Sequence, residues 1–120
     1  MKVLLDTNFL LLPNQFGVDI FRYLEYYDIF TLSSCLDELK KIGRGKGKDG
    51  RAAKVALKLI EQNKMKVIKS SEKTTDRAIL QYAIDEKCTV ATNDKELIKA
   101  LKNRGIKIIR LRQKKYLAEE

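Results

Sequence analysis

The chain of 120 residues contains no histidine. This absence excludes Ser-His and Cys-His nucleophilic arrangements and the usual His-containing zinc sites, because each of them requires an imidazole. Cysteine is also scarce: Cys35 and Cys88 are far apart in the sequence, and neither lies close to a second cysteine. We therefore expect two reduced thiols in or near the core and no structural disulfide. Any catalytic chemistry in this chain must depend on carboxylates.

Long apolar runs and low-complexity tracts are missing as well. No stretch approaches the ~20 apolar residues of a membrane-spanning helix, and Asp6 comes too early for a secretory signal. The length suits one domain with a real hydrophobic core but not two. We therefore expect one cytoplasmic domain over residues 1–120 that has no membrane partner.

Acidic residues are outnumbered by basic ones. The chain has 25 Lys and Arg against 16 Asp and Glu, which gives a formal net charge of +9. The excess is concentrated in Lys40–Lys58 and Lys102–Lys115, and we expect the second segment to lead into a basic C-terminal tail over residues 112–120. A solvated face is the plainer interpretation of a basic run. A surface of this charge nevertheless favours a polyanion such as RNA.

A glycine-rich connector occupies residues 43–50. It lacks the leading glycine and the Ser or Thr of a Walker loop and follows a predicted helix, so we reject a nucleotide-triphosphate site. We expect a mobile connector, and its basic side chains are candidates for contact with an RNA backbone. These RNA-binding candidates are Arg44, Lys46, Lys48 and Arg51.

Short apolar runs alternate with longer helical patterns along the whole chain. The predicted strands are Val3–Leu5, Ile29–Leu32, Met65–Ile68, Thr89–Ala91 and Ile106–Leu111. The predicted helices lie near Asp19–Tyr27, Ser34–Ile42, Gly50–Asn63, Thr75–Lys87 and Asp94–Arg104. This alternation predicts a three-layer α/β/α domain with a parallel, mostly doubly wound sheet. The functional site of such a sheet lies beyond the carboxyl ends of its strands, where the strand order reverses.

Four acids stand where an apolar run meets a turn or a helix start: Asp6, Glu38, Asp76 and Asp94. Asp6 ends the first strand, while Asp76 and Asp94 begin apolar stripes with helical i, i+3, i+4, i+7 spacing, which predicts that they face inward. Capping or pairing with a helix dipole would explain any one of them. Four inward acids without partners are costly to bury, and a shared cation removes that cost.

The neighbouring acid Asp37 has a separate interpretation. Ser34 and Asp37 have the spacing of a capping box at the start of a helix, which gives Asp37 a structural role. Glu38 remains as the functional candidate of this segment.

The four acids follow one another in an order typical of a known family, and the first and last of them lie in the segments Leu5-Asp6-Thr7-Asn8 and Ala91-Thr92-Asn93-Asp94-Lys95-Glu96-Leu97. On these features, nearly the whole chain resembles PIN-domain nucleases. Within this family, Phe16-Gly17-Val18-Asp19-Ile20, the basic glycine loop and Leu111-Arg112-Gln113-Lys114-Lys115 are most similar to archaeal relatives of the PIN nuclease that processes small-subunit pre-ribosomal RNA. Toxin PIN domains of toxin–antitoxin pairs share the acids, and this alternative stays open.

The resemblance implies a central five-stranded parallel sheet of order 3-2-1-4-5 and an endoribonuclease that cleaves single-stranded RNA or pre-rRNA. It also implies Mg²⁺ or Mn²⁺ as cofactor, Asp6, Glu38, Asp76 and Asp94 as the catalytic and metal-binding set, and Asn8, Thr92 and Asn93 as supporting residues. Many relatives carry Asp at the position of Glu96, and we favour a first-turn acid on the solvated side for this residue. A homodimer, a ribosome-assembly partner and an antitoxin partner stay open.

The proposed chemistry is coherent from the residue types alone, since hard divalent cations prefer carboxylate oxygens and a crowded acidic pocket selects Mg²⁺ or Mn²⁺ over zinc. Two rivals remain. One is a noncatalytic RNA-binding or assembly module, and the other is a phosphoryl-transfer domain with Asp6 as nucleophile. The second is disfavoured because Asn8 stands where a phosphatase of that type needs an acid.

Overall fold

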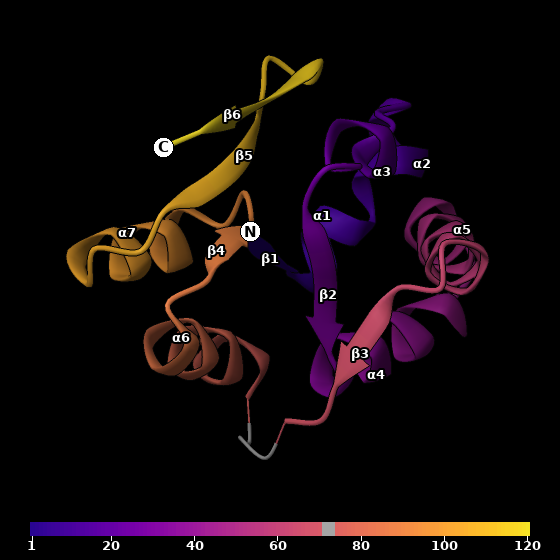
Figure 1. Cartoon of the computed structure of the whole chain (residues 1–120). Coiled ribbons are helices and arrows are strands. Elements are labelled where there is room, and N and C mark those ends of the chain that lie inside the picture. The colour runs from indigo at the N-terminus through magenta and orange to yellow at the C-terminus, as the bar shows by residue number, and fades with distance from the viewer. Residues whose placement is uncertain (71–73) are drawn as a thin grey trace.

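The computed structural model describes residues 1–70 and 74–120 and contains a six-stranded sheet (Figure 1). Its strands are β1 (Lys2–Leu5), β2 (Asp28–Leu32), β3 (Lys66–Ile68), β4 (Thr89–Ala91), β5 (Ile108–Arg112) and β6 (Tyr116–Glu119). They lie in the order β3-β2-β1-β4-β5-β6, in which the first five are parallel and β6 is antiparallel to β5. The predicted five strands and their order 3-2-1-4-5 are confirmed, and one further strand extends the sheet.

The helices are α1 (Thr7–Leu10), α2 (Leu12–Phe16), α3 (Ile20–Tyr23), α4 (Ser33–Gly43), α5 (Lys48–Gln62), α6 (Thr75–Glu86) and α7 (Lys95–Asn103). In Figure 1, α6 and α7 lie on one side of the sheet and α1, α2, α3 and α5 on the other. The strands feed both cores, because successive side chains point to opposite faces. Val3 and Leu5 pack with α1 to α5, and Leu4 packs with α6 and α7. The predicted three-layer α/β/α arrangement is confirmed.

Two short helices, α1 and α2, follow β1 where the sequence predicted only a polar turn. Each spans little more than one turn, so neither shows a full apolar period. Asp6 caps α1 by accepting a hydrogen bond from the backbone N–H of Phe9 (2.7 Å), and Pro13 lies in the first turn of α2. Phe9, Leu10 and Leu12 are buried, so this segment closes the core beside the end of β1.

The connector between α4 and α5 is shorter than the predicted 43–50. Helix α4 ends at Gly43 and α5 begins at Lys48, which leaves residues 44–47 between them. A Cβ at Gly50 would lie 2.1 Å from the carbonyl oxygen of Gly45, so glycine is required there for a close backbone approach. Gly50 therefore allows α4 and α5 to form a tight helical hairpin.

The predicted basic tail over residues 112–120 is wrong, since Tyr116–Glu119 forms β6. The turn that joins it to β5 places Gln113 and Lys114 at φ of 52° and 57°. Glu120 accepts hydrogen bonds from Lys102 (2.8 Å) and Arg112, and these partners lower the pKa of its carboxyl. The acidic end of the chain therefore neutralises part of the basic segment Lys102–Lys115.

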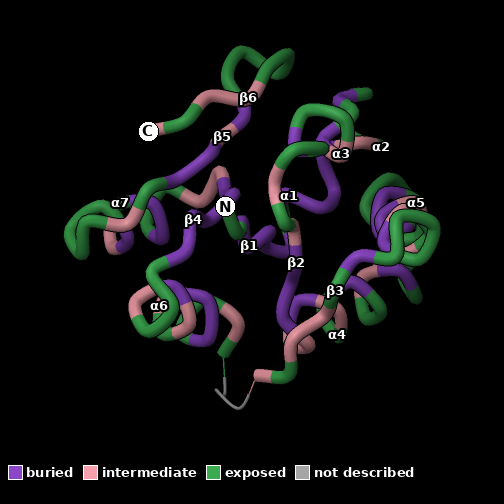
Figure 2. Tube along the Cα trace, in the orientation of Figure 1, coloured by how far each residue is buried: buried purple, intermediate pink, exposed green. Residues whose placement is uncertain are grey.

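Burial of the chain is concentrated in the central strands of the sheet and on the inner faces of the helices. Figure 2 shows β1 and β4 mostly buried, β6 partly buried to exposed, and the outer surfaces of the helices and the turn between β5 and β6 exposed. Cys35 and Cys88 are buried free thiols, as predicted. None of the helices within residues 1–70 and 74–120 is both long and apolar enough to cross a bilayer.

Candidate active site

The carboxyl ends of β1 and β4 form one edge of the sheet. β1 lies between β2 and β4, so the strand order reverses beside it, and this is where ligands bind in open α/β sheets. The backbone N–H of Asp6 donates to the carbonyl oxygen of Ala91 (3.2 Å), which brings the residue after β1 next to the end of β4. The predicted proximity of Asp6 and the Thr92–Asp94 segment is therefore present.

Asp6 is buried, with a relative exposure of 5%. Besides the N–H of Phe9, its carboxylate accepts a hydrogen bond from the Thr92 hydroxyl. The pKa of this carboxyl is raised to about 6, chiefly by burial and also by the charges of Asp94 and Asp76, while the two hydrogen bonds lower it. Asp6 is thus a desolvated acid among like charges.

Asp94 lies at the N-cap of α7. Its carboxylate accepts hydrogen bonds from the N–H groups of Glu96 (2.9 Å) and Leu97 (3.1 Å), and its own N–H donates to the Thr92 hydroxyl oxygen (3.1 Å). The hydroxyl of Thr92 therefore connects the Asp6 carboxylate to the start of α7. This gives a physical basis for the predicted supporting role of Thr92, which is fully buried.

Glu38 and Asp76 approach the same edge from α4 and α6. Glu38 accepts a 2.5 Å hydrogen bond from the Thr7 hydroxyl, directly after Asp6. Partial burial raises the pKa of Asp76, and the charges of Asp94, Glu38 and Glu96 raise it as well. The charges of Asp6, Asp76 and Asp94 therefore act on one another, and Glu38 is held beside Asp6 through Thr7. We call Asp6, Glu38, Asp76 and Asp94 together the acidic edge.

The burial expected for these acids is wrong for two of them. Glu38 and Asp76 are exposed, Asp94 is half-buried and only Asp6 is buried. The helical stripe fixes the direction of a side chain around the axis but not its depth, and Asp76 lies in the first turn of α6 and Glu38 in the second turn of α4. Between residues 1 and 70 and between 74 and 120, no three acids or cysteines are placed to hold one ion together.

Basic side chains do not neutralise the acidic edge. The ion pairs found among the described residues all involve Glu119 or Glu120, so no Lys or Arg of this part of the chain lies within 4.0 Å of the four acids. A polar pocket of about 340 Å³ adjoins Glu38 and is lined by Ser33, Ser34, Asp37, Glu38, Lys41, Ser70 and Thr75. The edge therefore combines uncompensated carboxylates with a concave polar surface.

The predicted capping box at Ser34 and Asp37 is wrong. Helix α4 begins at Ser33 with Leu32 at the N-cap position, one residue before the expected start. The Ser33 hydroxyl accepts a hydrogen bond from the N–H of Ser70 (2.9 Å), and the Ser70 hydroxyl donates to that of Ser34 (3.1 Å). These serines therefore join α4 to the end of β3.

The two asparagines predicted to support the site differ in position. Asn93 forms a two-way clip to β5, because its side chain donates to the carbonyl oxygen of Leu111 (3.2 Å) and accepts from the Leu111 N–H (2.8 Å). It holds the segment between β4 and α7 against the sheet. Asn8 lies exposed on α1, one residue after Thr7.

Sequence reasoning missed Thr7 and set Glu96 aside. Thr7 positions Glu38 through its hydroxyl, and its place directly after Asp6 was the available signal. Glu96 is exposed in the first turn of α7, as favoured, yet its charge acts on Asp76. Glu96 therefore adds one more negative charge that acts on the acidic edge.

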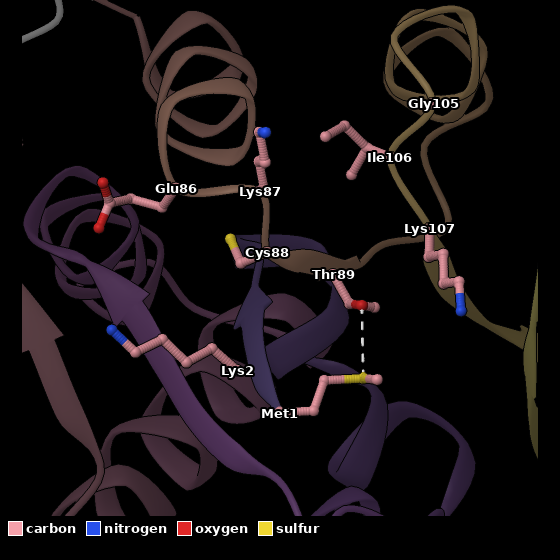
Figure 3. A pocket seen from close by; sticks show the side chains of 9 residues that line it. All are labelled: Met1, Lys2, Glu86, Lys87, Cys88, Thr89, Gly105, Ile106 and Lys107. Carbon is pink, nitrogen blue, oxygen red and sulfur yellow. Dashed lines mark hydrogen bonds between the residues drawn. The ribbon is translucent and has the colours of Figure 1, made fainter.

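A second pocket, of about 510 Å³, lies at the opposite edge of the sheet, where β1, β4 and β5 begin. Figure 3 shows that the side chains of Lys2, Lys87 and Lys107 around it point away from one another. Glu86 is its one acidic lining residue. This edge does not provide converging functional groups.

Comparisons with known proteins agree with this geometry. The family model described as a PIN like domain matches residues 3–114. "Ribonuclease VapC4" of Methanocaldococcus jannaschii is 36% identical over 96% of this chain and 93% of its own length, and "Ribonuclease VapC9" of Archaeoglobus fulgidus is 31% identical over 92% and 82%. The solved "Structure of the PIN domain endonuclease Utp24" superposes with a TM-score of 0.79 at 25% identity, over 99% of this chain and 90% of that one. The chain belongs to the PIN-like domain family.

Proposed function

We propose that this protein is a metal-dependent endoribonuclease that cleaves single-stranded RNA at the carboxyl edge of β1 and β4. The observation that carries the proposal is the buried, uncompensated carboxylate of Asp6 beside the other acids. The two similar proteins named as ribonucleases and the solved endonuclease with the same fold support it.

The donor chemistry of the edge fits Mg²⁺ or Mn²⁺. All candidate ligands are carboxylate oxygens, which hard divalent cations prefer, and the raised pKa of Asp6 reflects a site where a nearby cation would be favourable. Asp6, Glu38, Asp76 and Asp94 are the proposed ligands. Because no three of them converge on one point in the described part of the chain, the exposed side chains of Glu38 and Asp76 would have to move toward the ion. When bound, such an ion supplies a nucleophilic water near neutral pH and neutralises charge on the phosphodiester.

The chain's own residues orient these ligands. Thr92 holds the Asp6 carboxylate and the start of α7 through one hydroxyl, and Thr7 holds Glu38. The caps of α1 and α7 fix the carboxylates of Asp6 and Asp94. Asp6 and Asp94 are therefore pre-organised, which lowers part of the ordering cost of binding an ion.

Substrate attraction comes from the basic excess of the chain. Arg44, Lys46, Lys48 and Arg51 are exposed around the α4–α5 connection, where we propose that they contact phosphates. The net charge of +9 adds long-range attraction for RNA.

For the cellular role we propose ribosomal RNA processing in the cytoplasm, on the sequence resemblance described above. The alternative is a toxin-type ribonuclease with an antitoxin partner. A small overlapping antitoxin-like reading frame beside the gene would favour this alternative. A noncatalytic RNA-binding module is separated from both by a cleavage assay.

The test is digestion of a structured RNA with single-stranded loops by purified protein, with Mn²⁺ and with chelator. Wild type should cut the loops only with Mn²⁺, and Asp94→Asn should lose cleavage. Asp85→Asn is a matched control, because Asp85 is an exposed acid near the far end of α6 that accepts from Gln81 (2.8 Å). Equal cleavage by wild type and Asp94→Asn, or cleavage in chelator, would contradict the proposal.

A further inference from the structure

The two basic segments of the sequence meet at one exposed aromatic ring. Phe16, the last residue of α2, is 42% exposed, and the Lys114 Nζ lies 5.6 Å from the centre of its ring. Lys114 lies in the turn between β5 and β6, about one hundred residues along the chain. The Tyr23 hydroxyl donates to the carbonyl oxygen of Lys115 (3.5 Å), which joins the same turn to α3.

Phe16 also lines a pocket of about 500 Å³ between α2 and the start of α5. Its lining residues are Asn14, Gln15, Phe16, Lys48, Asp49 and Arg51. All six are exposed. The volume lies within the range of pockets that hold one small ligand.

We propose that this surface, defined by Asn14, Gln15, Phe16, Lys48, Arg51 and Lys114, binds one nucleotide of a single-stranded RNA by stacking its base on Phe16. The proposal rests on the proposed ribonuclease function and adds to it a specific binding subsite. Single-stranded nucleic acids are recognised by aromatic rings that stack on bases within cationic grooves, and amide side chains read base edges.

The composition of the surface matches each part of a nucleotide. Phe16 offers an apolar ring for the base, and the Asn14 and Gln15 amides offer both donors and acceptors for its edge. Lys48, Arg51 and Lys114 offer positive charge for the flanking phosphates and outnumber Asp49, the one acid among the residues that line the pocket. An acidic protein would satisfy the charges alone, whereas the ring beside two amides favours a nucleobase.

A tryptophan reporter tests the stacking directly, because the chain contains no tryptophan. In Phe16→Trp, a short oligouridylate added in chelator should quench the indole fluorescence as it binds. Tyr26→Trp is the matched control, since Tyr26 is 90% exposed in a pocket that it shares with Asp19, Arg22, Tyr23 and Glu25. The two acids outnumber the one base there, so we expect no phosphate to be held. The fluorescence of Tyr26→Trp should not change. Binding without quenching in Phe16→Trp would overturn the proposal.

Affinity measurements complete the test and need no cleavage. By fluorescence anisotropy in chelator, Phe16→Ala should weaken binding of labelled oligouridylate roughly tenfold, while Tyr26→Ala should have no effect. Lys114→Asn should reduce the salt slope by about 0.7, the value for one phosphate contact on a single strand. Asparagine tolerates the positive φ of this turn, so the fold should be kept.

The outcomes separate this subsite from the proposed function. If Phe16→Ala binds the single strand like wild type, or loses duplex RNA to the same degree, base stacking is refuted. Metal-dependent cleavage and its loss in Asp94→Asn would still stand. If wild type does not cleave but Phe16→Ala weakens binding, the catalytic proposal fails and the subsite is retained.

Discussion

Replacing Asp6 by Asn tests the acidic edge at its most buried member. Asparagine has nearly the same shape, and its side-chain oxygen can still accept the hydrogen bond from the Phe9 N–H that caps α1. It carries no charge at any pH. The substitution therefore removes the buried charge while keeping the cap, at the cost of the hydrogen bond that Thr92 donates.

The sign and size of the expected change in unfolding free energy follow from the pKa of Asp6, which is raised from its ordinary value of 3.8 to about 6. The folded protein then binds more protons than the unfolded chain between these values, so stability due to this group falls as the pH rises through that window. At pH values above the folded pKa, the unfolding free energy lost through this group reaches about 3 kcal/mol. Subtracting about 1 kcal/mol for the hydrogen bond from Thr92 leaves Asp6→Asn about 2 kcal/mol more stable than wild type.

The assay is a set of melting curves for wild type and Asp6→Asn in chelator, from about pH 4 to about pH 8. At the upper end the variant should melt roughly 5–10 °C higher, and this advantage should disappear at the lower end. Excess Mn²⁺ should raise the melting temperature of wild type more than that of the variant. A difference between the two proteins that stays constant with pH would refute a desolvated charge at Asp6.

Three further predictions concern the neighbouring ligands and the basic connector. In chelator, Asp94→Asn should melt at the same temperature as wild type or higher, because Asn also caps a helix and removes one like charge, whereas Asp94→Ala should lose about 1 kcal/mol of unfolding free energy. Mn²⁺ should raise the melting temperature of both variants less than that of wild type. An equal rise would make Asp94 only a helix cap. Thr92→Val should lower the unfolding free energy measured by chemical denaturation by about 1–3 kcal/mol, because the buried Asp6 carboxylate loses a hydrogen-bond donor, while Thr92→Ser should stay near wild type. Equal stability of all three proteins would contradict the role of Thr92 as a bridge between Asp6 and α7. Charge reversal at Arg44, Lys46 and Lys48 should weaken RNA binding and flatten its salt dependence in anisotropy titrations while circular dichroism stays unchanged, and unaltered affinity would make this loop a solvated connector.

The sheet was predictable because its strands are short apolar runs separated by strongly periodic helices. The five parallel strands follow the predicted order, and Thr89–Ala91 has the predicted bounds. Helices α1 and α2 were missed because four or five residues carry too little periodicity. β6 was missed because its turn contains Gln113 and Lys114 in place of the Asn-Gly typical of such turns. The pairing of Glu120 with Lys102, 18 residues earlier, is also not visible in local spacing.

The position of Asp6 beside the segment that leads to Asp94 was predictable from the sequence, whereas the burial of the four acids was not. Strand ends and helix starts brought Asp6 and Asp94 to one edge, since parallel strands share their carboxyl end. The periodicity that predicted buried positions for Glu38 and Asp76 says nothing about where the sheet stops, and both are exposed. The hydroxyl bridges of Thr7 and Thr92 depend on contacts between distant segments. Local spacing carries no information about such contacts.

The most direct test of the central claim, that the acidic edge holds the cation needed for cleavage, is paramagnetic broadening of backbone amide signals by Mn²⁺ in ¹H–¹⁵N spectra. At substoichiometric Mn²⁺, the amides of Asp6, Thr7 and the segment Thr92–Leu97 should broaden first. The amides of Lys87–Thr89 at the opposite edge should stay sharp, and Asp6→Asn should weaken the effect. Uniform broadening, or broadening first at the opposite edge, would contradict the proposed metal site.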